Sequence, residues 1–136
     1  MKAFSKKYII KAGREAVYTA LTNAKEVAAW SGSPAKMNAK PASAFSLWEG
    51  SIHGKNVTVS RKKIVQQWKE KGWDNYTTVS FIISEAKGIT TVELIHEGIP
   101  DTSFKSIKNG WDEYYMLPLK AHVESQINPI PFLNIF

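Results

Sequence analysis

The residues of this sequence best suited to acid–base chemistry are its histidines and tyrosines. The three histidines, His53, His96 and His122, lie far apart in the sequence, without the spacing of a metal site. His96 alternates with apolar residues, so we expect it to point inward, where a single histidine more often completes a core than acts as a base. His96 or Tyr115 would be the acid or base of an enzyme built on this chain. We expect neither role, no bound metal and no cofactor.

Other catalytic and binding motifs are missing or incomplete. The sequence has no cysteine, which excludes disulfides, thiolate zinc sites and a cysteine nucleophile. The segment GSIHGKN, residues 50–56, has the glycines and the lysine of a phosphate-binding loop, but it is one residue too short and ends without serine or threonine. The acidic pairs Asp112/Glu113 and Glu93/Glu97 lie opposite apolar stripes, so we interpret them as solvated.

The chain as a whole is basic. The 18 lysine and arginine residues outnumber the 12 acidic residues, for a formal net charge of +6. One basic cluster comprises Arg61, Lys62 and Lys63. A basic balance suits nucleic acid, an anionic membrane or an acidic protein face, or it simply keeps the surface solvated. Because the aromatic residues share the apolar stripes, we expect no nucleic-acid binding.

The N-terminal residues do not resemble a signal peptide, and no stretch approaches the ~20 apolar residues of a membrane span. We therefore expect a cytoplasmic protein that does not bind membranes.

The elements that must position these residues are read from apolar periodicity. Residues 3–12 alternate as a half-buried strand, and residues 13–30 show helical spacing that Asn23 divides into two short helices. Residues 42–99 contain no proline but five glycines, which predict about six antiparallel strands joined by short turns. Asp101 is a suitable N-cap for a long last helix to residue 126, with a kink at Pro118. The expected class is α+β, with the helix covering a curved sheet.

Strand parity and helix phase place a set of aromatic residues between this sheet and the last helix. We expect Trp111 and Tyr115, four residues apart, to face the sheet together, whereas Tyr114 lies at the margin and reaches solvent or a partner. A packed core and an open ligand cavity both fit this arrangement. The predicted cavity residues are Trp48, Trp68, Phe81, His96, Trp111 and Tyr115. The predicted partner-facing residues are Tyr114, Arg61, Lys62 and Lys63.

Several segments of the sequence resemble a known family. LWEGSIHGKN, KIVQQWKEKGW, TTVELIHEGIP and KNGWDEYYMLPLK look like the C-terminal domain of the activators of heat-shock protein 90 ATPase, and YTALTNAKEVAAWSG looks like its N-terminal helical pair. The resemblance covers residues 4 to 124. It implies the helix-grip fold of the START-like, or birch-pollen-allergen-like, superfamily: a curved antiparallel sheet of six to seven strands around a long C-terminal helix, with two short helices after the first strand. The eukaryotic activators also carry a separate N-terminal domain.

The resemblance implies a non-enzymatic, co-chaperone-like stress-response protein that binds heat-shock protein 90. The fold and the aromatic residues favour a second hypothesis, a carrier or sensor of a small hydrophobic ligand in the sheet–helix cavity. A cavity enzyme using His96 or Tyr115 is a third. We expect a monomer or a weak homodimer.

The predicted domain ends at residue 126, and an apolar tail with two prolines follows it at residues 127–136. Because exposed apolar ends promote aggregation, we expect the tail to dock, either on its own domain or on a second subunit.

Overall fold

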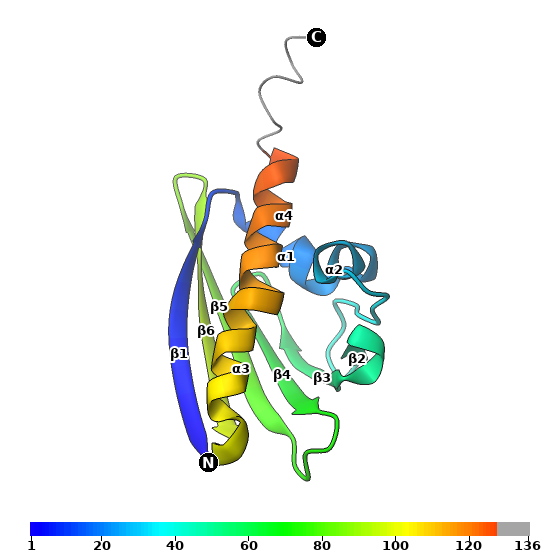
Figure 1. The fold of residues 1–136 in the computed structure, drawn as a ribbon. Helices are drawn as coiled ribbons and strands as arrows, with labels where there is room; N and C mark the ends of the chain where they lie inside the picture. The colour runs from blue at the N-terminus through cyan, green and yellow to red at the C-terminus, as the bar shows by residue number, and fades with distance from the viewer. Residues whose placement is uncertain (128–136) are drawn as a thin grey trace.

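The computed structural model describes residues 1–127, and for residue 127 only the backbone. The predictions for the tail, residues 127–136, therefore fall outside the described side chains. A single six-stranded antiparallel sheet, in the order β1-β6-β5-β4-β3-β2, curves around one long C-terminal helical stretch (Figure 1). This is the helix-grip arrangement that the resemblance implied. The strands are β1 (Lys2–Ile10), β2 (Ala44–Leu47), β3 (Ile52–Val59), β4 (Lys63–Glu70), β5 (Thr77–Ala86) and β6 (Ile89–Ile99).

Two short helices follow β1, as the sequence predicted: α1 (Arg14–Thr22) and α2 (Ala24–Ser31). Asn23 ends the first helix and caps the second, because its Oδ1 accepts hydrogen bonds from the backbone N–H groups of Lys25 and Glu26 at 3.0 and 3.1 Å. The indole N–H of Trp30 donates to the Ala20 carbonyl at 2.9 Å. These contacts fold the two helices against each other, and both pack against the last helix.

The inner face of the sheet carries the alternating apolar residues that the sequence indicated. Val79, Phe81 and Ile83 on β5, and Val92 and Leu94 on β6, are all fully or nearly fully buried. Strand β3 departs from this simple alternation. Alternation holds through Val57, so Asn56 is buried and Val57 is 50% exposed. The register shift between Asn56 and Thr58 then breaks it, and Thr58 is exposed as well.

Two of the glycines assigned to turns lie inside strands. Gly54 sits in β3, where an added Cβ would come within 1.7 Å of the Gln67 carbonyl oxygen on β4, so only glycine fits. Gly98 lies near the end of β6 with a φ of 81°. The glycines at 50, 72 and 88 do occupy turns, as predicted, and all three have positive φ.

The long C-terminal stretch is made of four consecutive helical pieces. They are a 3₁₀ turn η2 (Asp101–Ser103), α3 (Phe104–Gly110), the π-helical segment η3 (Trp111–Met116) and α4 (Leu117–Ile127). The predicted N-cap at Asp101 is wrong: its carboxylate pairs with the N-terminal amino group at 2.8 Å and caps no helix N–H. The kink at Pro118 stays a prediction. Pro118 lies in the first turn of α4, where its missing N–H is tolerated, and the π-helical segment ends at Met116.

The start of this stretch is tied to the β1 side of the sheet. Asp112 accepts hydrogen bonds from Lys6 Nζ at 2.7 Å and from Tyr8 Oη at 2.5 Å. Phe104 also packs edge-on against Phe4, with ring centroids 6.2 Å apart. Asp112 is therefore not the freely solvated residue that the sequence suggested. Because α3 packs against β1, this part of the helical stretch is held at the β1 side, and the candidate site lies on its other side, toward β3 and β4.

Candidate functional site

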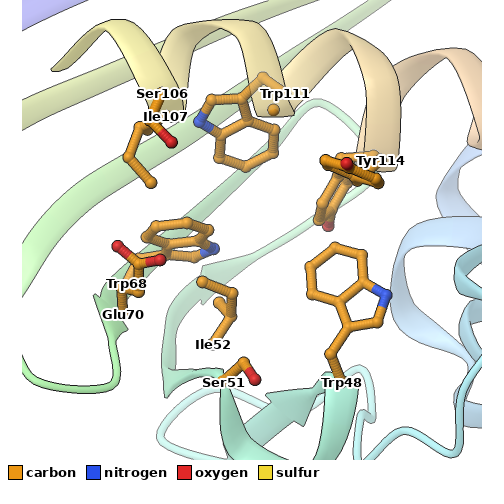
Figure 2. Close-up of a pocket in the computed structure, with 11 residues that line it drawn as sticks. Trp48, Ser51, Ile52, Trp68, Glu70, Ser106, Ile107, Trp111 and Tyr114 are labelled. Carbon is orange, nitrogen blue, oxygen red and sulfur yellow. The ribbon is translucent and has the colours of Figure 1, made fainter. Parts of the chain in front are cut away.

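A pocket of about 340 Å³ opens between the start of the C-terminal helical stretch and the β3–β4 side of the sheet (Figure 2). It is mostly apolar, and its few polar groups belong to two serines, a glutamate and the aromatic side chains. The lining residues are Trp48, Ser51, Ile52, Trp68, Glu70, Ser106, Ile107, Gly110, Trp111, Tyr114 and Tyr115.

Helical spacing builds the upper wall of this pocket. Ile107 and Trp111 are one turn apart, so their side chains lie on the same face. Gly110 leaves space beside them, because an added Cβ would meet only the Tyr114 ring, at 3.8 Å. Tyr114 is 59% exposed and forms the outer edge of the wall. The lower wall comes from β4 through Trp68 and from the residues around η1.

The 3₁₀ turn η1 (Trp48–Gly50) holds Trp48 at the pocket in an unusual backbone conformation. Trp48 and Glu49 have φ values of 51° and 57°, in the left-handed region that bulky residues rarely adopt. Each such residue costs roughly 1–3 kcal/mol, which surrounding contacts must offset. One such contact is the hydrogen bond from Trp48 Nε1 to the Ser31 carbonyl oxygen, at 3.0 Å.

Three tryptophan indoles line the pocket, and their N–H groups differ in a way that matters chemically. Trp48 donates to Ser31, and Trp111 donates to His96 Nδ1 at 3.0 Å. Trp68 Nε1 is buried and has no hydrogen-bond partner among the described residues. In Figure 2 the nitrogens of Trp48 and Trp111 point away from the pocket, whereas that of Trp68 points into the space near Trp48 and Tyr114.

His96 lies behind the pocket wall as part of a closed hydrogen-bond network. Thr77 Oγ1 donates to the Trp68 carbonyl oxygen at 2.6 Å and can then accept from His96 Nε2 at 2.8 Å. Trp111 donates to the other ring nitrogen. The imidazole is therefore neutral, with its proton on Nε2. Burial lowers the pKa of His96 to about 3, so it is unsuited to proton transfer near neutral pH.

Tyr115 is held among other rings and is 3% exposed. Its ring lies 4.6 Å from both Trp30 and Trp111, and it stacks on Phe81 at 5.8 Å. Burial raises the pKa of the Tyr115 hydroxyl well above its usual range. A phenol in this environment is a weak acid and contributes to the site mainly as an apolar surface.

The structure brings together four of the six predicted cavity residues: Trp48, Trp68, Trp111 and Tyr115 line the pocket. Phe81 and His96 do not, because both are completely buried beneath the first layer of rings. The sequence reasoning missed six lining residues. Two signals were available for them: Ile52 pairs with Glu70 across β3 and β4, and Ser106, Ile107 and Gly110 precede Trp111 on one helical face. The six are Ser51, Ile52, Glu70, Ser106, Ile107 and Gly110.

The residues predicted to face a partner lie on separate parts of the surface. Tyr114 is at the mouth of the pocket. Arg61 is held against α1 by two hydrogen bonds to the Glu15 carboxylate, at 2.9 and 3.1 Å, and its guanidinium lies 4.4 Å from the centre of the Tyr18 ring. Lys62 and Lys63 are exposed on the same turn.

Within residues 1–127, no group of three histidine, cysteine or acidic side chains could hold a metal ion. No helix in the same range has both the length and the apolar character needed to cross a bilayer.

Comparison with known sequences identifies the family. Residues 11–124 match the family described as Activator of Hsp90 ATPase homolog 1-like protein. An uncharacterised protein of Schizosaccharomyces pombe is 31% identical over 86% of this chain and 36% of its own length. The activator of 90 kDa heat shock protein ATPase homolog 1 of Homo sapiens is 27% identical over 78% of this chain and 32% of its own length. The chain thus spans about a third of the length of these relatives.

Solved structures show the same fold. The crystal structure of an HSP90 activator from Plasmodium falciparum superposes with a TM-score of 0.81 and 27% identity, covering 93% of this chain and 96% of that one. The solution structure of the Aha1 dimer from Colwellia psychrerythraea superposes with a TM-score of 0.77 at 22% identity, covering 91% of this chain and 97% of that one, a likeness that concerns the fold alone. On its sequence and its architecture, the chain belongs to the family of Activator of Hsp90 ATPase homolog 1-like proteins.

Proposed function

We propose that this chain is a binding domain that docks on heat-shock protein 90 and changes the rate at which the chaperone hydrolyses ATP. The observation that carries the proposal is the match with the Plasmodium falciparum structure. That chain is described as an HSP90 activator, and the alignment covers 96% of it and 93% of this chain. A single domain of this size and fold thus supports the co-chaperone hypothesis.

The surface charge supports an acidic docking partner. The net charge is +6, and several acidic side chains are already paired with cations, including Glu15, Asp101, Asp112 and Glu124. Exposed lysines such as Lys62 and Lys63 have no such partner among the described residues. Charges of this kind raise the association rate with an acidic surface, and salt screens them within about 8–10 Å.

Calorimetry and ATP turnover with the host's own heat-shock protein 90 test this proposal. We expect weak binding at low ionic strength, a loss of affinity as salt rises, and a change in ATP turnover. The double variant Lys62→Glu/Lys63→Glu should weaken binding, whereas Lys36→Glu/Lys40→Glu is a control with the same change in net charge. No heat of binding together with unchanged ATP turnover would rule the co-chaperone function out.

The pocket favours a second candidate function, the carriage or sensing of a small hydrophobic ligand. Its volume of about 340 Å³ lies at the lower end of the range of roughly 300–1,000 Å³ that is usual for small-molecule sites. An apolar wall with few polar groups also matches such sites. Mass spectrometry of organic extracts of the purified protein tests this function directly.

Catalysis is not part of either proposal. Both nitrogens of His96 are engaged and its pKa is low, and Tyr115 is enclosed by rings. A monomer or weak homodimer, a cytoplasmic location and the absence of nucleic-acid binding stay predictions. Light scattering on a concentration series would test the oligomeric state.

A further inference from the structure

We propose that the pocket is built for a compact, uncharged ligand that carries one hydrogen-bond acceptor, and that this acceptor binds the indole N–H of Trp68. The inference rests on the second candidate function, ligand carriage, and it adds the chemical class of the ligand. It is independent of docking on heat-shock protein 90.

The first argument is the unmatched donor. A tryptophan N–H can only donate, and native proteins leave very few buried donors without an acceptor. Trp68 is 4% exposed, and its Nε1 has no partner among the described residues. The backbone carbonyl of the same residue is already engaged, since it accepts from Thr77 Oγ1 at 2.6 Å. Two buried side-chain atoms lack a partner among the described residues, Gln66 Oε1 and Trp68 Nε1. Of these two residues, only Trp68 lines the pocket.

The second argument is direction. The other two indoles of the wall, Trp48 and Trp111, turn their N–H groups outward to protein acceptors. Only Trp68 turns its nitrogen to the pocket side of its ring (Figure 2), although the atom itself is covered. Its ring has little freedom to turn elsewhere, because it stacks on Trp111 at 5.3 Å and meets His96 edge-on at 4.9 Å. A ligand entering the pocket would find this donor already oriented.

The third argument concerns what surrounds the donor. Ile52, Ile107 and the aromatic rings supply an apolar surface, and the Glu70 carboxylate belongs to the lining. An anionic ligand would be repelled by Glu70, and no lysine or arginine belongs to the lining set. Trp48, whose backbone is in the left-handed conformation, also lines the pocket. Together these features select a neutral molecule with one acceptor, such as a ketone, an ester or an ether.

Two probes of nearly the same shape separate the acceptor from the apolar surface. 2-Acetylnaphthalene has a carbonyl acceptor, and 2-isopropenylnaphthalene replaces its oxygen with a methylene group. Their dissociation constants are measured by equilibrium dialysis for the wild type, Trp68→Phe and Trp73→Phe. Trp73 is the matched control, because its ring lies 6.0 Å from the Trp68 ring but does not line the pocket.

We divide the dissociation constant of 2-isopropenylnaphthalene by that of 2-acetylnaphthalene. This ratio should fall by about two- to tenfold in Trp68→Phe, because the variant loses one neutral hydrogen bond to the carbonyl probe. The ratio should stay unchanged in Trp73→Phe. Gly110→Leu, which adds a side chain to the open space without removing one, should abolish the binding of both probes. A ratio that does not respond to Trp68→Phe would overturn the proposal, even though ligand carriage would survive.

A second measurement uses the wild type alone and does not depend on the folding of any variant. In a ¹H–¹⁵N spectrum the indole N–H signal of Trp68 should move downfield with 2-acetylnaphthalene and not with 2-isopropenylnaphthalene. Equal shifts with both probes would overturn the assignment of the donor. Failure of both probes to bind would end ligand carriage and this inference together, without bearing on the chaperone.

Discussion

The two flanks of the C-terminal helical stretch are held in different ways. On the β1 flank, Asp112 is bonded to Lys6 and Tyr8, and Phe104 packs against Phe4. On the β3–β4 flank, the same stretch presents Trp111 and Tyr114 to an open pocket. The comparison shows that paired and packed side chains hold the helix at β1, whereas a pocket separates it from part of the sheet at β3 and β4.

The largest expected effect comes from the buried aromatic residue of the open flank. Trp111 borders the pocket, is 2% exposed and donates to His96. Trp111→Ala should lower the free energy of unfolding by about 3–5 kcal/mol, because it leaves a large cavity and an unpaired imidazole. Chemical denaturation measures this value, with Trp111→Phe as a milder control. A loss below about 1 kcal/mol would mean that the pocket already isolates this ring from the core.

The second effect is a pH dependence that originates behind the pocket. The pKa of His96 is lowered from 6.5 to about 3 in the folded state, so the unfolded chain binds this proton first. The contribution of neutral His96 to the free energy of unfolding is therefore complete above pH 6.5, and it is lost as the pH falls from 6.5 toward 3. Between pH 7 and pH 5, the free energy of unfolding of the wild type should fall by about 2 kcal/mol more than that of His96→Gln. Equal losses in the two proteins would contradict a buried neutral imidazole.

A smaller effect tests the closed flank. Partial burial works against the ionised form of Asp112, but the hydrogen bonds from Lys6 and Tyr8 prevail and lower its pKa. Asp112→Asn should lower the free energy of unfolding by about 1–2 kcal/mol. This is at the low end of the values for hydrogen bonds to charged groups, because Asp112 is partly exposed. Glu113→Gln, on the exposed neighbouring residue, should change stability by less than about 0.5 kcal/mol. Similar costs for the two variants would show that Asp112 does not hold the helix to β1.

The smallest effect is expected at the rim of the open flank. Tyr114 is 59% exposed, so Tyr114→Ala should cost less than about 1 kcal/mol. Thermal melts in which Tyr114→Ala is more destabilising than Trp111→Ala would contradict the assignment of Trp111 to the buried face of the helix and Tyr114 to its exposed face. If the open flank also docks a partner, Tyr114→Ala should weaken that binding without changing the melting temperature.

Much of the fold could be predicted because it depends on short-range periodicity. Alternating Val79, Phe81 and Ile83 define a buried strand face wherever the sheet lies, and Ile107, Trp111 and Tyr115 define a helix face. The resemblance then supplied the order of the layers. The pocket was predicted only in part. Trp68, Trp111 and Tyr115 follow from parity and phase, but the same rules also brought in Phe81 and His96, which lie one layer deeper.

Tertiary structure decided the features that periodicity cannot encode. The bulge after Asn56 and the tight approach at Gly54 depend on the partner strand. The left-handed turn at Trp48 depends on Ser31, which lies 17 residues earlier in the chain.

By itself, the sequence determined which side chains face the sheet–helix interior, because a period of two or of about 3.6 residues is a local property of the backbone. Only the tertiary structure decided which interior groups find partners. Trp111 meets His96 across 15 residues, whereas Trp68 meets no acceptor. That difference arises because hydrogen bonds over such separations require the three-dimensional positions of both partners. The indole N–H of Trp111 is therefore part of the packed interior, whereas that of Trp68 is the group for which we propose a ligand.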